Sequence, residues 1–285
     1  MNQKIKTIAV IGAGTMGRGI AYVSCLAGYA TKLYDVEDNI LNKAVESIAG
    51  SFRKAVDKGL LTPATVDQAL ALLQTTTDLD NAAQAADFVI EAIPEKIDLK
   101  IDLFRQLDQV TPKHTIFATN TSSLSITEMA GATQRAPQVI GMHFFNPVPV
   151  MKLIEIIRGL ETAEATIAAT QEVAQAMKKE IVVINESPGF ITTRINAMIG
   201  NEAFYMLQEG VASAREIDKA LKLGLNHPMG PFELVDLVGL DVRLSILNFL
   251  HQTLGEKFRP CPLMVKYVKA GRLGRKMGKG VYDYS

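Results

Sequence analysis

The chain has 285 residues, 48% of them hydrophobic, so it is long and apolar enough to bury one large core or two ordinary ones. Its 30 acidic residues balance its 30 basic residues, which argues against nucleic acid or a membrane surface as a partner attracted by net charge. Its two cysteines, Cys25 and Cys261, lack the spacing of metal ligands, so neither a zinc site nor a disulfide framework is expected.

The predicted elements begin with a β-α-β unit. Residues 5–11 form an apolar run typical of a strand, residues 15–27 have helical periodicity, and residues 31–35 are typical of a second strand. A long helix is predicted at 38–58, with Asp38 or Asn39 as its cap, and another opens at Thr62-Pro63. Further strands are predicted at 87–93, 115–119, 139–143, 151–157 and 180–184, and further helices at 97–109 and 163–178. This alternation predicts an α/β fold, with a doubly wound, Rossmann-type, mostly parallel sheet and helices on both faces.

The pattern changes after Ser187-Pro188-Gly189. Residues 190–209, 214–223, 232–254 and 262–270 all have helical periodicity, and no strand is predicted among them. We therefore predict a sheet domain at residues 1–186 and an all-α C-terminal domain at residues 187–285. Because the chain starts directly with a strand and no apolar run approaches membrane-spanning length, a cytoplasmic protein without a membrane partner is expected.

A glycine-rich turn joins the first predicted strand to the first predicted helix. It matches G-x-G-x-x-G and consists of Gly12, Ala13, Gly14, Thr15, Met16 and Gly17. In this context the glycines allow a tight turn and let the backbone approach a pyrophosphate at the helix N-terminus. Asp35, at the end of the second strand, would accept hydrogen bonds from a ribose diol and repel a 2′-phosphate. The motif therefore predicts a dinucleotide site for NAD rather than NADP.

A second group of polar residues lies between positions 120 and 155. Residues 120–123, Asn-Thr-Ser-Ser, follow a predicted strand at the carboxyl end of the sheet, where open α/β folds bind ligands, although such a run is also typical of helix caps. His143 ends the next strand, and a turn at 146–149 can fold the following segment back beside it. That segment carries Glu155 in an otherwise apolar strand, where a carboxylate needs a partner such as an imidazole. We therefore predict a general base, His143, held by Glu155.

Together these residues resemble the L-3-hydroxyacyl-CoA dehydrogenase family, most closely its short bacterial members that act on 3-hydroxybutyryl-CoA. The resemblance covers both predicted domains. It rests on residues 12–17, 120–124, 143–152, 188–190 and 227–234, and on Asp236 and residues 239–241.

The resemblance implies a hydride transfer between NAD and C3 of an acyl-CoA. His143 would be the base in oxidation and the acid in reduction, Glu155 would orient its imidazole, and Ser122 would hold the C3 oxygen. Around the cofactor, beside residues 12–17 and Asp35, the resemblance places Glu95, Lys100, Asn120, Ser122, Asn146 and Lys276. Around the substrate it places Ser51, Arg53, Lys54, Lys58, Ser122 and Asn146, although a basic helix face is also explained by exposure to solvent.

One position departs from the family pattern. Thr193 stands where the family often has an asparagine before Arg194, so an amide donor to the substrate is missing. Either Thr193 or Asn196, three residues further along the same helix face, can take its place. By analogy with its relatives, the helical domain is expected to form a homodimer and to cover the acyl end of the cleft.

Two rival functions remain open on the sequence. A dehydrogenase of free hydroxy acids or sugar acids is similar in sequence, but the basic residues of the long helix favour a CoA ester. A non-enzymatic NAD-binding relative of the lens-crystallin kind is expected to lack Ser122, His143 or Glu155, and this chain has all three.

Overall fold

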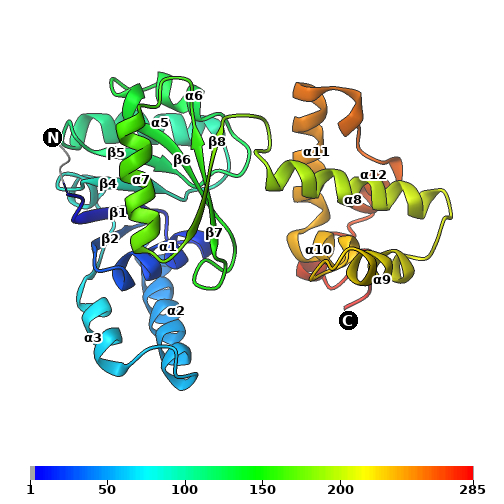
Figure 1. Cartoon of the computed structure of the whole chain (residues 1–285), viewed down its shortest axis with the longest axis horizontal. Helices are drawn as coiled ribbons and strands as arrows, with labels where there is room; N and C mark the ends of the chain where they lie inside the picture. The colour runs from blue at the N-terminus through cyan, green and yellow to red at the C-terminus, as the bar shows by residue number, and fades with distance from the viewer. Residues whose placement is uncertain (1–3, 285) are drawn as a thin grey trace. The chain divides into compact units, whose positions relative to one another are not determined.

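The computed structural model describes residues 4–284. Within them an eight-stranded sheet forms the centre of the first part of the chain (Figure 1). Its strands are β1 (Thr7–Ile11), β2 (Ala30–Tyr34), β3 (Leu73–Thr76), β4 (Phe88–Glu91), β5 (Ile116–Thr119), β6 (Val139–Phe144), β7 (Leu153–Arg158) and β8 (Glu180–Asn185). Their order in space is β3-β2-β1-β4-β5-β6-β7-β8, and every neighbouring pair is parallel except β6 and β7. The carboxyl ends of β1, β2, β4, β5 and β6 therefore meet at one edge, where α/β sheets bind ligands.

Helices cover both faces of this sheet. They are α1 (Thr15–Leu26), α2 (Asp38–Asp57), α3 (Pro63–Ala71), α4 (Leu79–Ala83), α5 (Ile97–Val110), α6 (Ile126–Gly131) and α7 (Glu164–Ala176), with a short 3₁₀ turn, η1 (Ala136–Gln138). In β1, Ile8 and Val10 join the apolar cluster that contains α1, α2 and α7. Alternate residues point to the opposite face, where Phe104 of α5 packs on Phe117 of β5 with ring centroids 5.5 Å apart. Figure 1 shows α7 in front of the strands and α5 behind them.

The central strands are buried on both faces, which explains their continuous apolar runs. All four residues of β4 and of β5 are buried, as are all six of β6. Burying a single large side chain such as Phe88 stabilises the fold by about 1.5–3 kcal/mol. Charged residues buried in this part of the chain, among them Glu91, Lys100, His143 and Glu155, are therefore exceptions that need an explanation.

The second part of the chain is helical. It contains α8 (Thr192–Gln208), α9 (Ala214–Gly224), α10 (Pro231–Val238), α11 (Leu240–Leu254) and α12 (Pro262–Lys269), with 3₁₀ turns η2 (Glu256–Phe258) and η3 (Arg275–Met277). Its core is a separate apolar cluster in which Phe204 packs edge-on against Phe232, with centroids 5.2 Å apart. By its internal contacts the chain divides into two units, the first ending at Glu186 and the second beginning at Ser187.

The predicted fold class is confirmed, and most predicted elements occur with ends shifted by a few residues. The strand β3 was not predicted because its residues, Leu-Gln-Thr-Thr, form a half-exposed edge strand without an apolar run. The short helix α4, capped by Asp78, was also missed. The long helix predicted at 232–254 is wrong, since Gly239 at φ 107° divides it into α10 and α11. The cap of α2 is Glu37 rather than Asp38 or Asn39.

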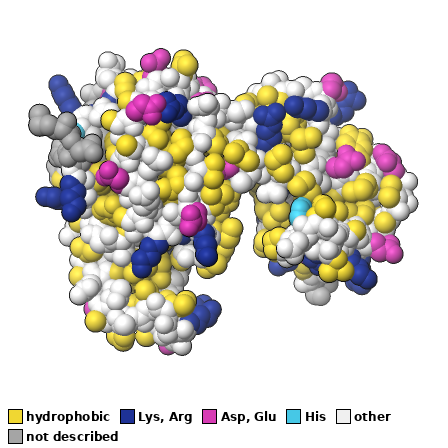
Figure 2. Space-filling model, viewed as in Figure 1, with side chains coloured by type: hydrophobic (Ala, Val, Ile, Leu, Met, Phe, Trp, Pro, Cys, Tyr) yellow, Lys and Arg dark blue, Asp and Glu magenta, His cyan; other side chains and the backbone are white. Residues whose placement is uncertain are grey.

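The distribution of charged side chains on the surface agrees with the zero net charge of the chain. On the face drawn in Figure 2, basic and acidic side chains are scattered among apolar and uncharged ones. None of the helices within residues 4–284 combines the length and the apolarity that a membrane span requires.

Candidate active site

The pairing of β6 with β7 brings His143 and Glu155 together. The two residues are direct partners in the antiparallel ladder, and opposed side chains lie on the same face of the sheet. His143 Nδ1 lies 2.7 Å from Glu155 Oε2, and the two side chains are 8% and 1% exposed. A buried carboxylate bonded to one ring nitrogen fixes the orientation of the ring and favours a proton on that nitrogen. The arrangement suits a group that gains and loses a proton at Nε2.

The glycine-rich turn has the tight geometry of a dinucleotide site. A Cβ on Gly17 would lie 1.7 Å from the carbonyl oxygen of Gly12, and Gly12 itself has φ 103°. These two glycines are therefore required by the packing of the chain. Gly14 differs, because a Cβ there would have no heavy atom within 4 Å. Packing does not explain Gly14, whereas the close approach of a pyrophosphate to the backbone does.

A cavity of 630 Å³ lies over this turn, and its composition fits a dinucleotide. Gly12, Gly14, Thr15, Met16 and Asp35 line it, together with Tyr34, Val36, Ile40, Ala92, Ile93, Pro94 and Leu99. Asp35 Oδ2 accepts a hydrogen bond of 2.8 Å from the backbone N–H of Ala13. That contact holds the carboxylate beside the turn, at the end of β2, where the residue that binds the ribose is expected in this fold.

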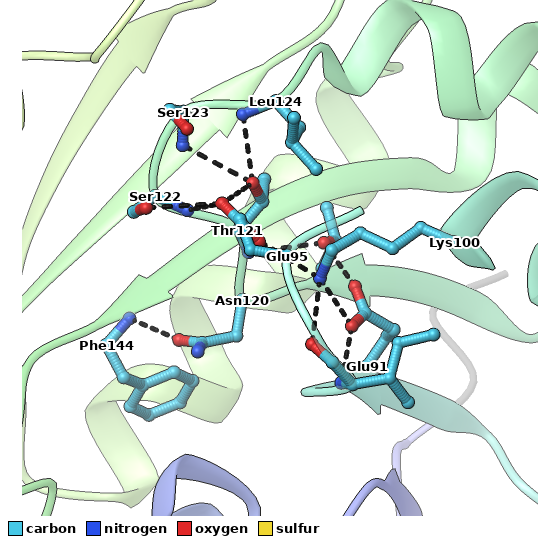
Figure 3. A network of polar contacts seen from close by, with 11 residues as sticks. Glu91, Glu95, Lys100, Asn120, Thr121, Ser122, Ser123, Leu124 and Phe144 are labelled. Carbon is cyan, nitrogen blue, oxygen red and sulfur yellow. Dashed lines mark hydrogen bonds and ion pairs between the residues drawn. The ribbon is translucent and has the colours of Figure 1, made fainter. Parts of the chain in front are cut away.

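A buried ionic network lies next to the cavity (Figure 3). Lys100 Nζ lies 2.6 Å from Glu91 Oε1 and 3.3 Å from Glu95 Oε2. Glu91 also accepts hydrogen bonds from Thr119 and from the N–H of Ile93. Because Lys100 is 1% exposed and is not among the residues that line the cavity, its ammonium group acts on the site through the two carboxylates.

Glu95 connects this network to the segment after β5. Its Oε1 accepts hydrogen bonds from the Thr121 hydroxyl at 2.5 Å, the Ser122 N–H at 2.9 Å and the Ser122 hydroxyl at 3.2 Å. Burial acts to raise the pKa of Glu95, but the Lys100 ammonium and these hydrogen bonds outweigh it, so the pKa lies below its ordinary value. A charged Glu95 thus holds the Ser122 loop in place.

The loop after β5 is also fixed to the strand that carries the histidine. Asn120 Oδ1 accepts a hydrogen bond of 2.9 Å from the N–H of Phe144, the neighbour of His143. The cap of the following helix, α6, is Ser125, which accepts from the N–H of Glu128. Residues 121–123 are therefore not helix caps, and the second interpretation of the Thr-Ser-Ser run is wrong.

A second cavity, of 460 Å³, lies between α1, α2 and the loop that joins β6 to β7. Three of the four residues predicted on α2, Ser51, Lys54 and Lys58, line it, and so does Asn146. Arg53 is exposed and does not line it, because it projects from another face of α2. Two lining residues of α1 were missed, Arg18 and Tyr22, although their spacing with Thr15 and Gly19 was visible in the sequence.

The remaining predicted site residues belong to the helical unit. Thr193 and Asn196 lie in the first turns of α8, three residues apart and therefore on one side of the helix. Lys276 donates to Asp241 at 2.6 and 2.7 Å. The sequence did not predict the structural role of two buried aspartates of this unit: Asp218 accepts from the Tyr282 hydroxyl, and Asp236 accepts from the N–H groups of residues 281 and 282. They hold the end of the chain against α9 and α10.

The sheet is of the Rossmann type, and one of its edges carries both a dinucleotide cavity and a histidine held by a carboxylate. These features are those of a dinucleotide-dependent dehydrogenase. Family models agree: the NAD binding domain of 3-hydroxyacyl-CoA dehydrogenase matches residues 7–187, and its C-terminal domain matches residues 189–284. The chain belongs to the 3-hydroxyacyl-CoA dehydrogenase family. The predicted family and the predicted NAD cofactor are confirmed.

Individual relatives resemble the chain over almost its whole length. A probable 3-hydroxybutyryl-CoA dehydrogenase of Bacillus subtilis is 47% identical, covering 99% of this chain and 98% of its own. A 3-hydroxybutyryl-CoA dehydrogenase of Bradyrhizobium diazoefficiens is 46% identical, covering 98% and 96%. The crystal structure of (S)-3-hydroxybutyryl-CoA dehydrogenase from Ralstonia eutropha superposes with a TM-score of 0.96 at 44% identity, covering 99% of this chain and 100% of its own.

Proposed function

We propose that the protein transfers a hydride between NAD(H) and C3 of short-chain L-3-hydroxyacyl-CoA and 3-ketoacyl-CoA thioesters, with 3-hydroxybutyryl-CoA and acetoacetyl-CoA as its main pair. The observation that carries this proposal is the 2.7 Å contact between His143 and Glu155 at the edge of the sheet that also holds the dinucleotide cavity. The names of the similar dehydrogenases from Bacillus, Bradyrhizobium and Ralstonia support the same substrate pair.

The chain's part in the reaction is to move one proton and to orient the reacting oxygen. Bound NAD⁺ supplies the hydride acceptor. In oxidation His143 takes the proton of the C3 hydroxyl at Nε2, and in reduction it returns the proton, a role worth about 10²- to 10⁴-fold in rate. Glu155 holds Nδ1–H and stabilises the imidazolium that forms. Ser122, fixed by Glu95, hydrogen-bonds to the C3 oxygen.

Cofactor recognition is assigned to both sides of the dinucleotide cavity. Residues 12–17 bind the pyrophosphate, and Asp35 binds the adenosine ribose diol. By resemblance to the family, Glu95, Asn120 and Ser122 are assigned to the nicotinamide end, and Lys100 acts through Glu95, with which it pairs. Asn146 and Lys276 complete the cofactor set by resemblance to the family.

Substrate recognition is assigned to the second cavity and to α8. Ser51, Lys54 and Lys58 bind the CoA nucleotide, since cations that line a cavity suit phosphate groups. Asn146, on the loop between β6 and β7, belongs to the same set. In place of the family's asparagine on α8 we propose Thr193, with Asn196 as the alternative donor.

The cationic cavity separates this function from its enzymatic rival. A dehydrogenase of free hydroxy acids has no need for three cations lining a cavity away from the reacting histidine, whereas a CoA thioester carries its phosphates there. Initial rates with acetoacetyl-CoA and with a free 3-keto acid, each with NADH and NADPH, distinguish the two functions. Faster turnover of the free acid would contradict the proposal.

Replacing the histidine tests whether the site is catalytic. His143→Ala should lower kcat by about 10²- to 10⁴-fold while the affinity for NADH stays close to that of the wild type. Turnover is followed by NADH absorbance, and binding by NADH fluorescence. A control, His251→Ala, changes a histidine at the end of α11 that pairs with Glu256 at the surface, and it should leave turnover unchanged. Near-normal turnover of His143→Ala would remove this residue from the mechanism. Absence of turnover by the wild type itself would favour the non-enzymatic NAD-binding relative.

We also propose that the protein is a cytoplasmic homodimer, joined through its helical unit. Ile191, Ile195 and Met198, spaced along one side at the start of α8, are 48%, 52% and 40% exposed, which is unusual for a stripe of large apolar residues. Light scattering of the full chain tests the assembly. Ile195→Lys should shift the mass toward the monomer, and an unchanged dimer would place the interface elsewhere.

A further inference from the structure

The cavity of 460 Å³ is built from one face of each of two helices. On α1, Arg18 and Tyr22 are one turn apart and both line it. On α2, Ser51, Lys54 and Lys58 line it at intervals of three and four residues. These intervals mean that the side chains of each helix share one face. All these residues belong to the first unit.

The charge that lines this cavity is entirely positive. Arg18, Lys54 and Lys58 contribute three cations, and none of the lining residues is an acid. Within residues 4–284, none of the three side chains takes part in an ion pair or a hydrogen bond, although Arg18 is half-buried. A partly desolvated guanidinium without a counter-ion is costly, and an anion in the cavity would remove that cost. Its planar fork of donors matches the oxygens of a phosphate.

The cavity also has an aromatic wall. Tyr22 is 6% exposed, and its ring stacks on Phe52 with centroids 4.0 Å apart, which holds it rigidly at the side of the cavity. Phosphate-binding cations next to a fixed aromatic ring suit a ligand that has phosphates and a planar base. The ligand chemistry is that of a phosphorylated nucleotide.

We propose that Arg18 is a specificity-determining residue, which binds a phosphate of the CoA nucleotide together with Lys54 and Lys58. The proposal rests on the proposed function, in which the substrate is a CoA thioester. Arg18 lies directly after the glycine motif in sequence, but its side chain lines the cavity next to α2 and not the dinucleotide cavity. It therefore distinguishes a CoA thioester from the same acyl group on pantetheine, which lacks the nucleotide.

The test compares two substrates that differ only in the nucleotide. With saturating NADH, Arg18→Met should lower kcat/KM for acetoacetyl-CoA about tenfold, mainly through KM, since one phosphate contact is worth about 1.4 kcal/mol. The kcat/KM for acetoacetyl-pantetheine should stay unchanged. Arg18→Lys should restore part of the loss, because a lysine keeps the charge but not the fork. Arg105→Met, which removes an exposed arginine of α5 that pairs with Asp102, is the matched control and should change kcat/KM for neither substrate.

Three outcomes would overturn the proposal. Equal losses for both thioesters would mean that Arg18 does not contact the nucleotide, and an unchanged kcat/KM for acetoacetyl-CoA would mean that it contacts no part of it. A higher KM for NADH, with the thioester unaffected, would assign the guanidinium to the dinucleotide.

Calorimetric titration with free CoA keeps this test independent of turnover. The wild type should bind CoA more tightly than Arg18→Met does. The two proteins should have the same affinity for pantetheine. A wild type that binds CoA in this way but reduces neither thioester would contradict the proposed function and leave the role of Arg18 intact. Equal affinity of both proteins for CoA would overturn that role.

Discussion

The pair formed by His143 and Glu155 permits a quantitative prediction for Glu155→Gln, which keeps the shape of the side chain and removes its charge. The contact is 2.7 Å long and the carboxylate is 1% exposed, so solvent does not screen it. A hydrogen bond to a charged group contributes about 1.5–3 kcal/mol, and each 1.4 kcal/mol is a factor of about ten in rate. The lost stabilisation of the imidazolium alone should therefore lower kcat about 10- to 150-fold.

The tautomer adds a second loss. A glutamine can turn its amide so that the NH₂ group donates to Nδ1, which leaves the proton on Nε2 and prevents that atom from accepting another. In other enzymes the corresponding change from acid to amide lowers kcat by about 10⁴. We therefore expect a fall in kcat for Glu155→Gln between about 10² and 10⁴, with little change in KM for either substrate.

The assay is the initial rate of NADH oxidation with acetoacetyl-CoA, supported by thermal unfolding and by NADH fluorescence. Removing a buried charge while keeping its volume should leave the melting temperature close to that of the wild type. A folded variant that binds NADH and retains kcat within about threefold of the wild type would refute the assignment of Glu155, because loss of one such hydrogen bond costs more than that.

Three further predictions concern the cofactor side of the site. Asp35→Asn removes the charge but keeps an acceptor for the backbone N–H of Ala13. The ratio of kcat/KM for NADPH to kcat/KM for NADH should therefore rise about tenfold or more. An unchanged ratio would mean that Asp35 does not face the ribose. Gly17→Ala should fail to fold, because its Cβ would lie 1.7 Å from a backbone oxygen. Gly14→Ala should unfold at the wild-type temperature but bind NADH more weakly. NADH binding by Gly14→Ala as tight as that of the wild type would contradict the position given to the pyrophosphate. Lys100→Met leaves the buried Glu91 carboxylate without its cation and should destabilise the protein by about 3–5 kcal/mol in chemical unfolding, and a loss below about 1 kcal/mol would mean that the pair is not buried in solution.

The parts of the site that were predicted from sequence are those that depend on short stretches of chain. The glycine motif needs only a strand before it and a helix after it, and the partner of His143 follows from a single turn between two strands. The parts that were missed depend on contacts between distant segments. Glu91 lies inside the strand predicted at 87–93, and only the fold reveals that Lys100 and Thr119 satisfy its buried carboxylate. Arg18 was not predicted as a site residue, because it lies next to the glycine motif in sequence and only the fold places it beside the residues of α2 that line the same cavity.

The loop between β6 and β7 contributes both to the proton-transfer pair and to the proposed nucleotide subsite. It reverses the chain so that β7 runs antiparallel to β6, and this register alone puts Glu155 opposite His143, since a slip of one residue would turn the carboxylate to the other face. The buried ammonium of Lys179 holds the loop by donating to the carbonyl oxygens of Val148 at 2.5 Å and of Met151 at 2.7 Å. Residues 146–150 of the same loop form one wall of the cavity that Arg18 lines. One segment, held by Lys179, therefore contributes both to the pairing of His143 with Glu155 and to the proposed nucleotide subsite.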